Sequence, residues 1–150
     1  MSAATPNFSV SKTPAMQEGP ANSARKRMVV VDDSNTILHM ICTLLEHHKL
    51  AEVVGTAENG LDAIEMVTAV SPDLVLIDAE LPEMSGLRTS LVLSQMQPDA
   101  RIILMTMDPE KQFLTACAGC GAHAVIYKPR FLHELALLLG QDLESQATLA

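Results

Sequence analysis

The chain has 150 residues, of which 48% are hydrophobic and only 3% aromatic, and its formal net charge is −8. This aliphatic content is enough for one folded domain with an aliphatic core, and it excludes disorder along most of the length. The acidic balance argues against direct binding of nucleic acid, which usually needs a basic face, but it is compatible with divalent cations.

The sequence carries no signal for export or for insertion into a membrane. Its three cysteines, Cys42, Cys117 and Cys120, do not form the even framework of a disulfide-rich secreted domain. The N-terminus lacks the charged and apolar regions of a signal peptide, and no apolar run reaches the roughly 18 residues that span a bilayer. We therefore predict a cytoplasmic protein with no membrane contact.

The domain organisation is predicted from shifts in composition. Residues 1–24 are rich in Ser, Ala, Pro and Asn without apolar periodicity, which predicts a disordered arm. The folded domain spans 25–145 and opens with a basic triplet that we interpret as a solvated flank of the first strand. A polar tail follows at 146–150, so we expect a stand-alone domain. A piece of a longer regulator with a DNA-binding output domain is the open alternative.

Strand-like and helix-like segments alternate along the folded part. Short apolar runs predict buried strands, and the segments between them carry apolar residues at helical spacing. The strands are apolar on both faces, as a parallel sheet covered on both sides requires. We predict a flavodoxin-like, doubly wound α/β fold with strand order 2-1-3-4-5 and five helices. The strands are expected at 28–31, 52–56, 73–77, 101–105 and 124–127, and the helices at 34–47, 61–71, 87–96, 109–121 and 131–143.

Polar residues stand where these strands end. Asp32 and Asp33 follow the first strand, Asp78 the third, Thr106 the fourth and Lys128 the fifth. In a parallel sheet all these ends lie on one edge, and ligands bind there at the switch point, between strands one and three in this order. The sequence therefore predicts a site at this edge.

The residue types in this set favour phosphoryl chemistry. Carboxylates held close together repel one another, and Mg²⁺ (or Mn²⁺) with its preference for hard oxygen ligands relieves that repulsion. A carboxylate beside the ion can attack phosphorus and form an acyl phosphate. Lys128 can then neutralise one phosphoryl oxygen, and the Thr106 hydroxyl can hydrogen-bond another.

Over about residues 27–145 the sequence resembles the receiver domain of two-component response regulators. Each matching motif is weak alone, but their order, spacing and strand-end positions together are specific. The motifs are the Asp32–Asp33 pair, Asp78 within Asp-Ala-Glu-Leu-Pro-Glu-Met-Ser-Gly at 78–86, Thr106 after Ile-Ile-Leu-Met, and the Lys128–Pro129 pair.

The resemblance implies a role for each residue of the set. Asp78 would accept a phosphoryl group from the phosphohistidine of a sensor histidine kinase or phosphotransfer protein. Asp33, Asp78 and the backbone carbonyl of Glu80 would bind Mg²⁺, and Asp32 would act through a metal-bound water. Thr106 and Lys128 would hold and sense the phosphoryl group, and Pro82, Gly86 and Pro129 would be structural, with a cis peptide bond before Pro129.

The resemblance also implies a signalling domain rather than an enzyme, with self-catalysed phosphotransfer and autodephosphorylation only. Phosphorylation would change the conformation and so the binding of a downstream protein target. Three residues of the expected switch surface depart from the pattern or extend it. Met107 replaces a small residue and has the size to crowd the phosphoryl site and slow transfer or hydrolysis. Val125 replaces a common aromatic, and Tyr127 on the same strand face is either a substitute or a packing residue.

Two further acidic residues flank the expected site. Glu80 lies two residues after Asp78, and Asp108 lies two residues after Thr106. The resemblance implies that these positions tune the lifetime of the phosphoryl group by repelling or orienting the attacking water, with the direction left open.

Other signals are interpreted as structural. The CxxC at 117–120 could be redox-active or half of a metal site, but without a second pair we interpret both cysteines as small packing groups. His47, His48 and His123 lack ligand spacing and are expected at the surface. The apolar run at 135–139 either buries wholly against the sheet or leaves a face for a homodimer or partner.

Two rival functions remain at this point. A haloacid-dehalogenase-type phosphatase also uses an aspartate nucleophile, but there it lies on the first strand, and its second aspartate would here be Glu80. A receiver fold that is never phosphorylated and only binds other proteins is kept open by Met107 and Val125.

Overall fold

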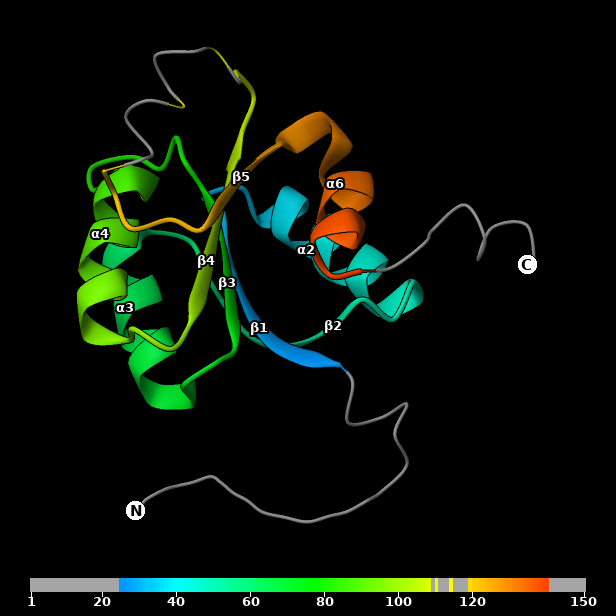
Figure 1. The fold of residues 1–150 in the computed structure, drawn as a ribbon, viewed down its shortest axis with the longest axis horizontal. Coiled ribbons are helices and arrows are strands. Elements are labelled where there is room, and N and C mark those ends of the chain that lie inside the picture. The colour runs from blue at the N-terminus through cyan, green and yellow to red at the C-terminus, as the bar shows by residue number, and fades with distance from the viewer. Residues whose placement is uncertain (1–24, 109, 111–113, 115–118, 141–150) are drawn as a thin grey trace.

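The computed structural model describes residues 25–108, 110, 114 and 119–140. Five parallel strands form one sheet in the order β2-β1-β3-β4-β5, with helices packed on both of its faces (Figure 1). This confirms the predicted doubly wound fold and strand order. The strands are β1 Lys26–Val31, β2 Ala51–Ala57, β3 Leu74–Asp78, β4 Arg101–Thr106 and β5 Ala124–Tyr127. The helices are α2 Asn35–His47, α3 Gly60–Val70, α4 Gly86–Met96 and α6 Phe131–Leu138, with a short 3-10 turn at Lys128–Arg130.

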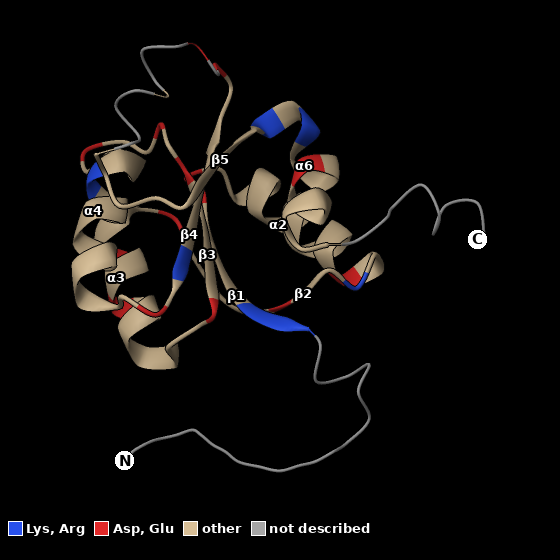
Figure 2. Ribbon diagram, viewed as in Figure 1, with Lys and Arg blue, Asp and Glu red and all other residues tan. Residues whose placement is uncertain are grey.

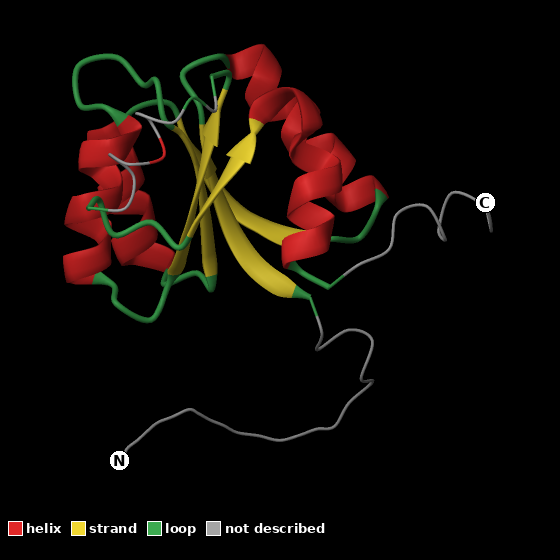
Figure 3. Cartoon of the chain, turned by 45° about the horizontal axis from the view of Figure 1, so that its top comes forward, coloured by secondary structure: helices red, strands yellow, loops and turns green. Residues whose placement is uncertain are grey.

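The sheet is the middle of three layers (Figure 3). Because successive strand residues point to opposite faces, Met28 and Val30 pack toward α2 and α6 while Val29 and Val31 pack toward α3 and α4. All four of these side chains are fully buried. Burial on both faces makes the sheet a rigid frame, and it fixes where each strand delivers the residue at its carboxyl end.

Side-chain caps set the helix starts. The Ser34 hydroxyl accepts from the Ile37 N–H (3.2 Å), as predicted, and Asn59 caps α3 in the same way through the Asp62 N–H (2.8 Å). The prediction that the last helix continues to about residue 143 is wrong, since α6 ends at Leu138. Gly140 has φ +75°, the left-handed conformation with which glycine ends helices.

The amino end of the sheet is tied together by hydrogen bonds. The Asp73 carboxylate accepts from the Arg27 N–H (2.9 Å), and the Arg27 side chain donates to the Ser71 carbonyl (2.9 Å). The Asp73 carbonyl in turn accepts from the Arg101 N–H (2.9 Å). Within the basic triplet, Lys26 is exposed as predicted, whereas Arg27 also links β1 to the segment before β3.

Several sequence predictions lie outside the described residues. They are the N-terminal arm at 1–24, the tail at 146–150, Cys117, and most of the helix expected between 109 and 121. Within the described part of the chain, no helix is long and apolar enough to cross a membrane.

Candidate functional site

The strand register brings the predicted site residues to one edge of the sheet. Val31 pairs with Ile77, so Asp32 follows β1 beside the end of β3. Asp78 pairs with Met105 on β4, and Thr106 pairs with Tyr127 on β5, directly before Lys128. Acidic residues gather at this carboxyl edge, where β3 and β4 end, whereas the start of β1 at the opposite edge is basic (Figure 2).

A buried ion triad forms the centre of the site. The Lys128 ammonium lies 2.6 Å from Oδ2 of Asp32 and 3.3 Å from Oδ2 of Asp78. The side chains of Asp32 and Asp78 are 1% and 5% exposed, and that of Lys128 is 16% exposed. The negative charges of two carboxylates this deeply buried need positive charge nearby. The single ammonium group that they share neutralises them only in part.

Backbone N–H groups hold the other oxygen of each carboxylate. The Ser34 N–H donates to Oδ1 of Asp32 (2.9 Å), and the Glu80 N–H donates to Oδ1 of Asp78 (3.0 Å). Oδ2 of Asp32 is buried and, among the described residues, has no partner that meets hydrogen-bond geometry, although the Lys128 ammonium is within 2.6 Å. The ion pair is therefore the main interaction of this oxygen, and the oxygen keeps capacity for another cation.

Burial shifts the pKa of the two kinds of group in the triad in opposite directions, but the net shift is upward for both Asp78 and Lys128. Burial raises the pKa of Asp78, and the nearby Asp32 charge adds to this, against the Glu80 N–H and Lys128, which lower it. Burial lowers the pKa of Lys128, but its close contact with the Asp32 carboxylate and the charges of Asp78 and Asp32 outweigh burial, so the net shift is upward. Lys128 therefore stays protonated at neutral pH.

Three carboxylates can meet a single cation here. Asp32, Asp33 and Asp78 each offer an oxygen, and these oxygens lie within 4.8 Å of one another. Asp33 is exposed while the other two are buried, so the group opens to solvent on one side. A hard, all-oxygen donor set with an open side, together with the incompletely satisfied Asp32 oxygen, fits Mg²⁺ or Mn²⁺.

Thr106 is fully buried beside this cluster. Its hydroxyl lies 3.0 Å from Oε2 of Glu80 and accepts from the Asp108 N–H at 3.0 Å. The sequence placed Thr106 and Glu80 near Asp78 but gave no reason to expect them to bond to each other. No local pattern signals this contact, because it joins residues on two different strand ends.

The loop after Asp78 is held by a close backbone approach. A Cβ at Gly86 would overlap the carbonyl oxygen of Asp78, and the Gly86 N–H donates to the Ala79 carbonyl (3.0 Å). Glycine is thus required where α4 begins so that the loop can fold back under the acceptor residue. Pro82, the other residue expected to be structural in this loop, is exposed.

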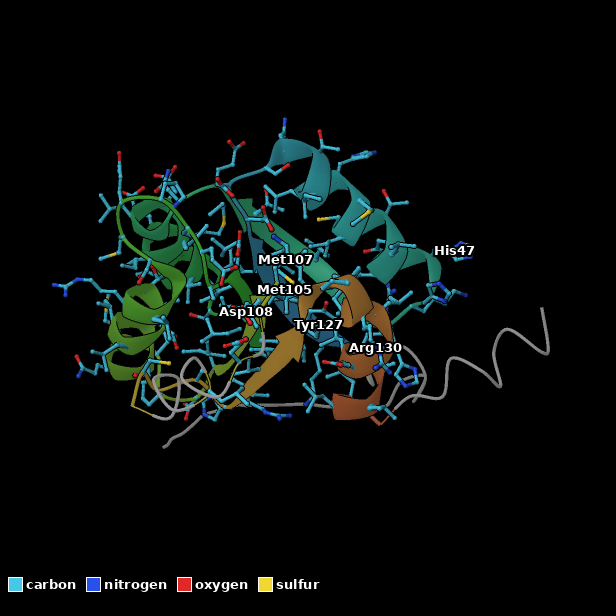
Figure 4. The ribbon with its side chains drawn as sticks, turned by 90° about the horizontal axis from the view of Figure 1, so that it is seen from above. His47, Met105, Met107, Asp108, Tyr127 and Arg130 are labelled. Carbon is cyan, nitrogen blue, oxygen red and sulfur yellow. The ribbon has the colours of Figure 1, made fainter. Side chains whose placement is uncertain are left out.

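The three switch-surface residues have different surroundings. Met107 is 58% exposed. It lines a mostly apolar pocket whose other residues include Lys128, Pro129 and Phe131, and that it crowds the phosphoryl site stays a prediction. Val125 packs with the cluster on the α3–α4 side. Tyr127 is half-buried, and its N–H donates to Glu134 of α6 (2.8 Å). Figure 4 looks down on this edge and shows Met107 and Asp108 over the strand ends.

The remaining cysteine and histidine predictions have mixed outcomes. Cys120 is buried, as expected for a packing residue, but it lies in a turn rather than in a helix. His47 and His123 are exposed and His48 is half-buried. His123 nevertheless has a structural role, because its Nδ1 accepts from the Ile102 N–H (3.0 Å) where β4 and β5 begin to pair.

The family assignment rests on this geometry and on a sequence match. The response regulator receiver domain family matches residues 28–139, which covers most of the chain. The chain belongs to the receiver domain family of two-component response regulators. Receiver domains act as signalling domains, and the fold and site described above fit that role.

Two similar proteins are longer than the region that they share with this chain. A protein-glutamate methylesterase/protein-glutamine glutaminase of Clostridium acetobutylicum is 33% identical over 73% of this chain and 32% of its own length. The response regulator GacA of Pseudomonas aeruginosa is 29% identical over 80% of this chain and 56% of its own length. The chain thus spans about a third to just over half of these relatives.

Solved structures share the fold. The signal receiver domain of an HD domain-containing protein from Pseudomonas fluorescens has a TM-score of 0.69 at 29% identity, covering 83% of this chain and 98% of that one. The signal receiver domain of the putative response regulator NarL from Mycobacterium tuberculosis has a TM-score of 0.71 at 24% identity, covering 77% of this chain and 93% of that one.

Proposed function

We propose that Asp78 accepts a phosphoryl group from the phosphohistidine of a sensor histidine kinase or phosphotransfer protein. The observation that carries this proposal is the buried Asp32–Lys128–Asp78 triad at the carboxyl ends of neighbouring strands. A buried carboxylate pair sharing one ammonium group is costly for folding alone, and its cost is understandable if the site binds a cation and an anionic group.

The chain's own residues would supply positioning and charge. The Glu80 N–H fixes Oδ1 of Asp78, which orients the carboxylate for attack on phosphorus. An Asp78 oxygen forms the new P–O bond, the donor's N–P bond breaks, and the imidazole leaves with the electron pair. Lys128 already reaches Asp78, and it can neutralise charge on the transferred group.

Asp32, Asp33 and Asp78 would hold the Mg²⁺ or Mn²⁺, together with the Glu80 backbone carbonyl that the family resemblance implies. When bound, the ion would offset the repulsion between the carboxylates and the incoming phosphoryl oxygens. Asp32 is the carboxylate that Lys128 approaches most closely, so the ion pair with Asp32 would hold the ammonium beside Asp78 when the phosphoryl group arrives.

The output would be protein binding, from a chain that turns over no substrate of its own. Leu137 and Leu138 of α6 are exposed, while Leu135 and Ala136 are buried, so a homodimer or target surface on this helix is consistent with the predicted partly apolar outer face. The downstream target and the cytoplasmic location stay predictions from the sequence.

The proposal is tested by intact mass after incubation with Mg²⁺ and acetyl phosphate. Wild type should gain one phosphoryl group, Asp78→Asn should gain none, and chelator should prevent the gain. Asp73→Asn is the matched control at the other end of β3 and should behave as wild type, because Asp73 contacts backbone only at the amino end. Absence of phosphorylation and of beryllofluoride binding in wild type would favour the interaction-module alternative.

A further inference from the structure

The hydroxyl of Thr106 is already committed to a carboxylate. It lies 3.0 Å from Oε2 of Glu80 and 3.2 Å from the Asp108 carbonyl, and it accepts from the Asp108 N–H at 3.0 Å. A threonine hydroxyl has one proton to donate, and the charged, nearer acceptor takes it in preference to the neutral carbonyl. The proton that a phosphoryl oxygen would use is therefore given to Glu80.

We infer that Glu80 is an internal competitor for the phosphoryl group, because its carboxylate holds the Thr106 hydroxyl that a phosphoryl group on Asp78 needs. The inference rests on the proposed function, since it concerns the same site. Phosphorylation then has to displace the Glu80 side chain, and loss of the phosphoryl group lets it return. Glu80 acts in this way as a positioning residue that sets how readily the site is occupied.

The structure allows such an exchange without refolding. The Glu80 backbone is fixed through its N–H bond to Asp78 (3.0 Å), so the side chain is always near the acceptor. The Glu80 residue is exposed, so its carboxylate can turn into water at little cost, whereas fully buried Thr106 stays in place. A carboxylate next to a negatively charged phosphoryl group is also repelled, which drives the exchange in the same direction.

The first experiment measures binding of beryllofluoride, a phosphoryl stand-in, to the full chain in Mg²⁺ by titration calorimetry. Glu80→Ala should tighten binding about fivefold, the size of one net hydrogen bond. Glu80→Gln should tighten it about twofold, because the amide oxygen still accepts from Thr106 but lacks the charge. Glu83→Gln, an exposed glutamate on the same loop, removes the same charge and should leave affinity unchanged.

A second pair of variants separates competition for the hydroxyl from simple charge repulsion. In a Thr106→Val background the gain from Glu80→Ala should disappear, and in Thr106→Ser, which keeps a hydroxyl, it should persist. If the Thr106→Val variant binds beryllofluoride too weakly to measure, the salt dependence of the Glu80→Ala gain separates the two explanations instead. An affinity gain that comes from hydrogen-bond competition should persist in about 0.5 M salt, whereas a gain that comes from long-range charge repulsion should shrink, because salt screens the repulsion.

The outcomes are separable from those of the proposed function. Binding to wild type with no gain in Glu80→Ala, or an equal gain in Thr106→Val, overturns the inference and leaves the phosphoryl site intact. Binding only after Glu80 is replaced supports it in its strongest form. Failure of wild type and both Glu80 variants to bind overturns the phosphoryl site itself, and the inference with it.

Discussion

The two ends of strand β3 carry the same residue type in opposite roles. Asp73, directly before the strand, is exposed, and its carboxylate accepts from the Arg27 N–H at 2.9 Å. Asp78, at the carboxyl end, is 4% exposed and shares Lys128 with a second buried carboxylate. The Asp73 carboxylate satisfies a backbone N–H donor of the neighbouring strand. The Asp78 carboxylate instead adds to the negative charge buried at the carboxyl edge.

The difference shows which aspartate the fold needs and which aspartate the fold tolerates. A carboxylate that closes a backbone hydrogen bond at an exposed turn stabilises the sheet. A buried pair of carboxylates opposes folding unless cations compensate it. The carboxyl end therefore has the features of a site kept for function, and substitutions at the two ends should move stability in different directions.

The largest expected effect is at Lys128. Lys128→Met removes the ammonium group shared by Asp32 and Asp78 and leaves two buried carboxylates uncompensated. We expect a loss of about 3 kcal/mol in the free energy of unfolding, measured by urea denaturation in EDTA. Added Mg²⁺ should restore part of it. Lys26→Met, an exposed lysine at the amino end of β1, should change stability little, and an equal loss there would contradict the comparison.

Gly86 comes next. An added Cβ would overlap the Asp78 carbonyl oxygen, a backbone atom that cannot turn aside. Gly86→Ala should therefore cost about 2 kcal/mol and lower beryllofluoride affinity as the acceptor loop shifts. Gly55→Ala is the control, because the added Cβ meets only the flexible end of Met66. A smaller cost for Gly86→Ala than for Gly55→Ala would show that the loop is not held as described.

Substitution of Asp78, unlike the two substitutions above, should raise the free energy of unfolding. Its pKa is raised from the ordinary 3.8, so the folded state binds the proton more tightly than the unfolded state does. The group therefore supports folding below its ordinary pKa, and this support is lost as pH rises through the folded-state value. In EDTA at pH 7, Asp78→Asn should gain about 1 kcal/mol, and the gain should vanish as pH falls below about 3.8.

The smallest effect is expected at Asp73. Asp73→Ala removes the acceptor of the Arg27 N–H at an exposed position, so we expect a loss of about 0.5 to 1 kcal/mol. Thermal unfolding of this variant beside Asp78→Asn compares the two ends of one strand directly. Stabilisation by Asp73→Ala would remove the distinction between a structural and a functional aspartate.

Much of the fold and the membership of the site could be predicted from the sequence. Apolar runs of strand length mark β1 to β5, and the polar residue after each run marks the carboxyl edge, because parallel strands end together. The sequence pattern does not predict where α6 ends. Hydrophobic periodicity continues past Gly140, and the conformation of that glycine overrides it.

The contacts inside the site could not be predicted in the same way. The approach of Lys128 to both carboxylates and the bond from Thr106 to Glu80 depend on side-chain rotamers and on residues far apart in the chain. The sequence shows the size of Met107 but not its surroundings. In the structure Met107 lines a pocket together with Lys128 and Phe131, residues that follow a different strand.

The most direct test of the central claim is to trap the modified residue chemically. The chain is incubated with acetyl phosphate and Mg²⁺, and sodium borohydride then reduces any aspartyl phosphate to homoserine, which peptide sequencing by mass spectrometry locates. We expect homoserine at position 78 alone, with Asp32, Asp33 and Asp73 unchanged. Homoserine at another aspartate, or a phosphoryl group that borohydride does not convert, would contradict it.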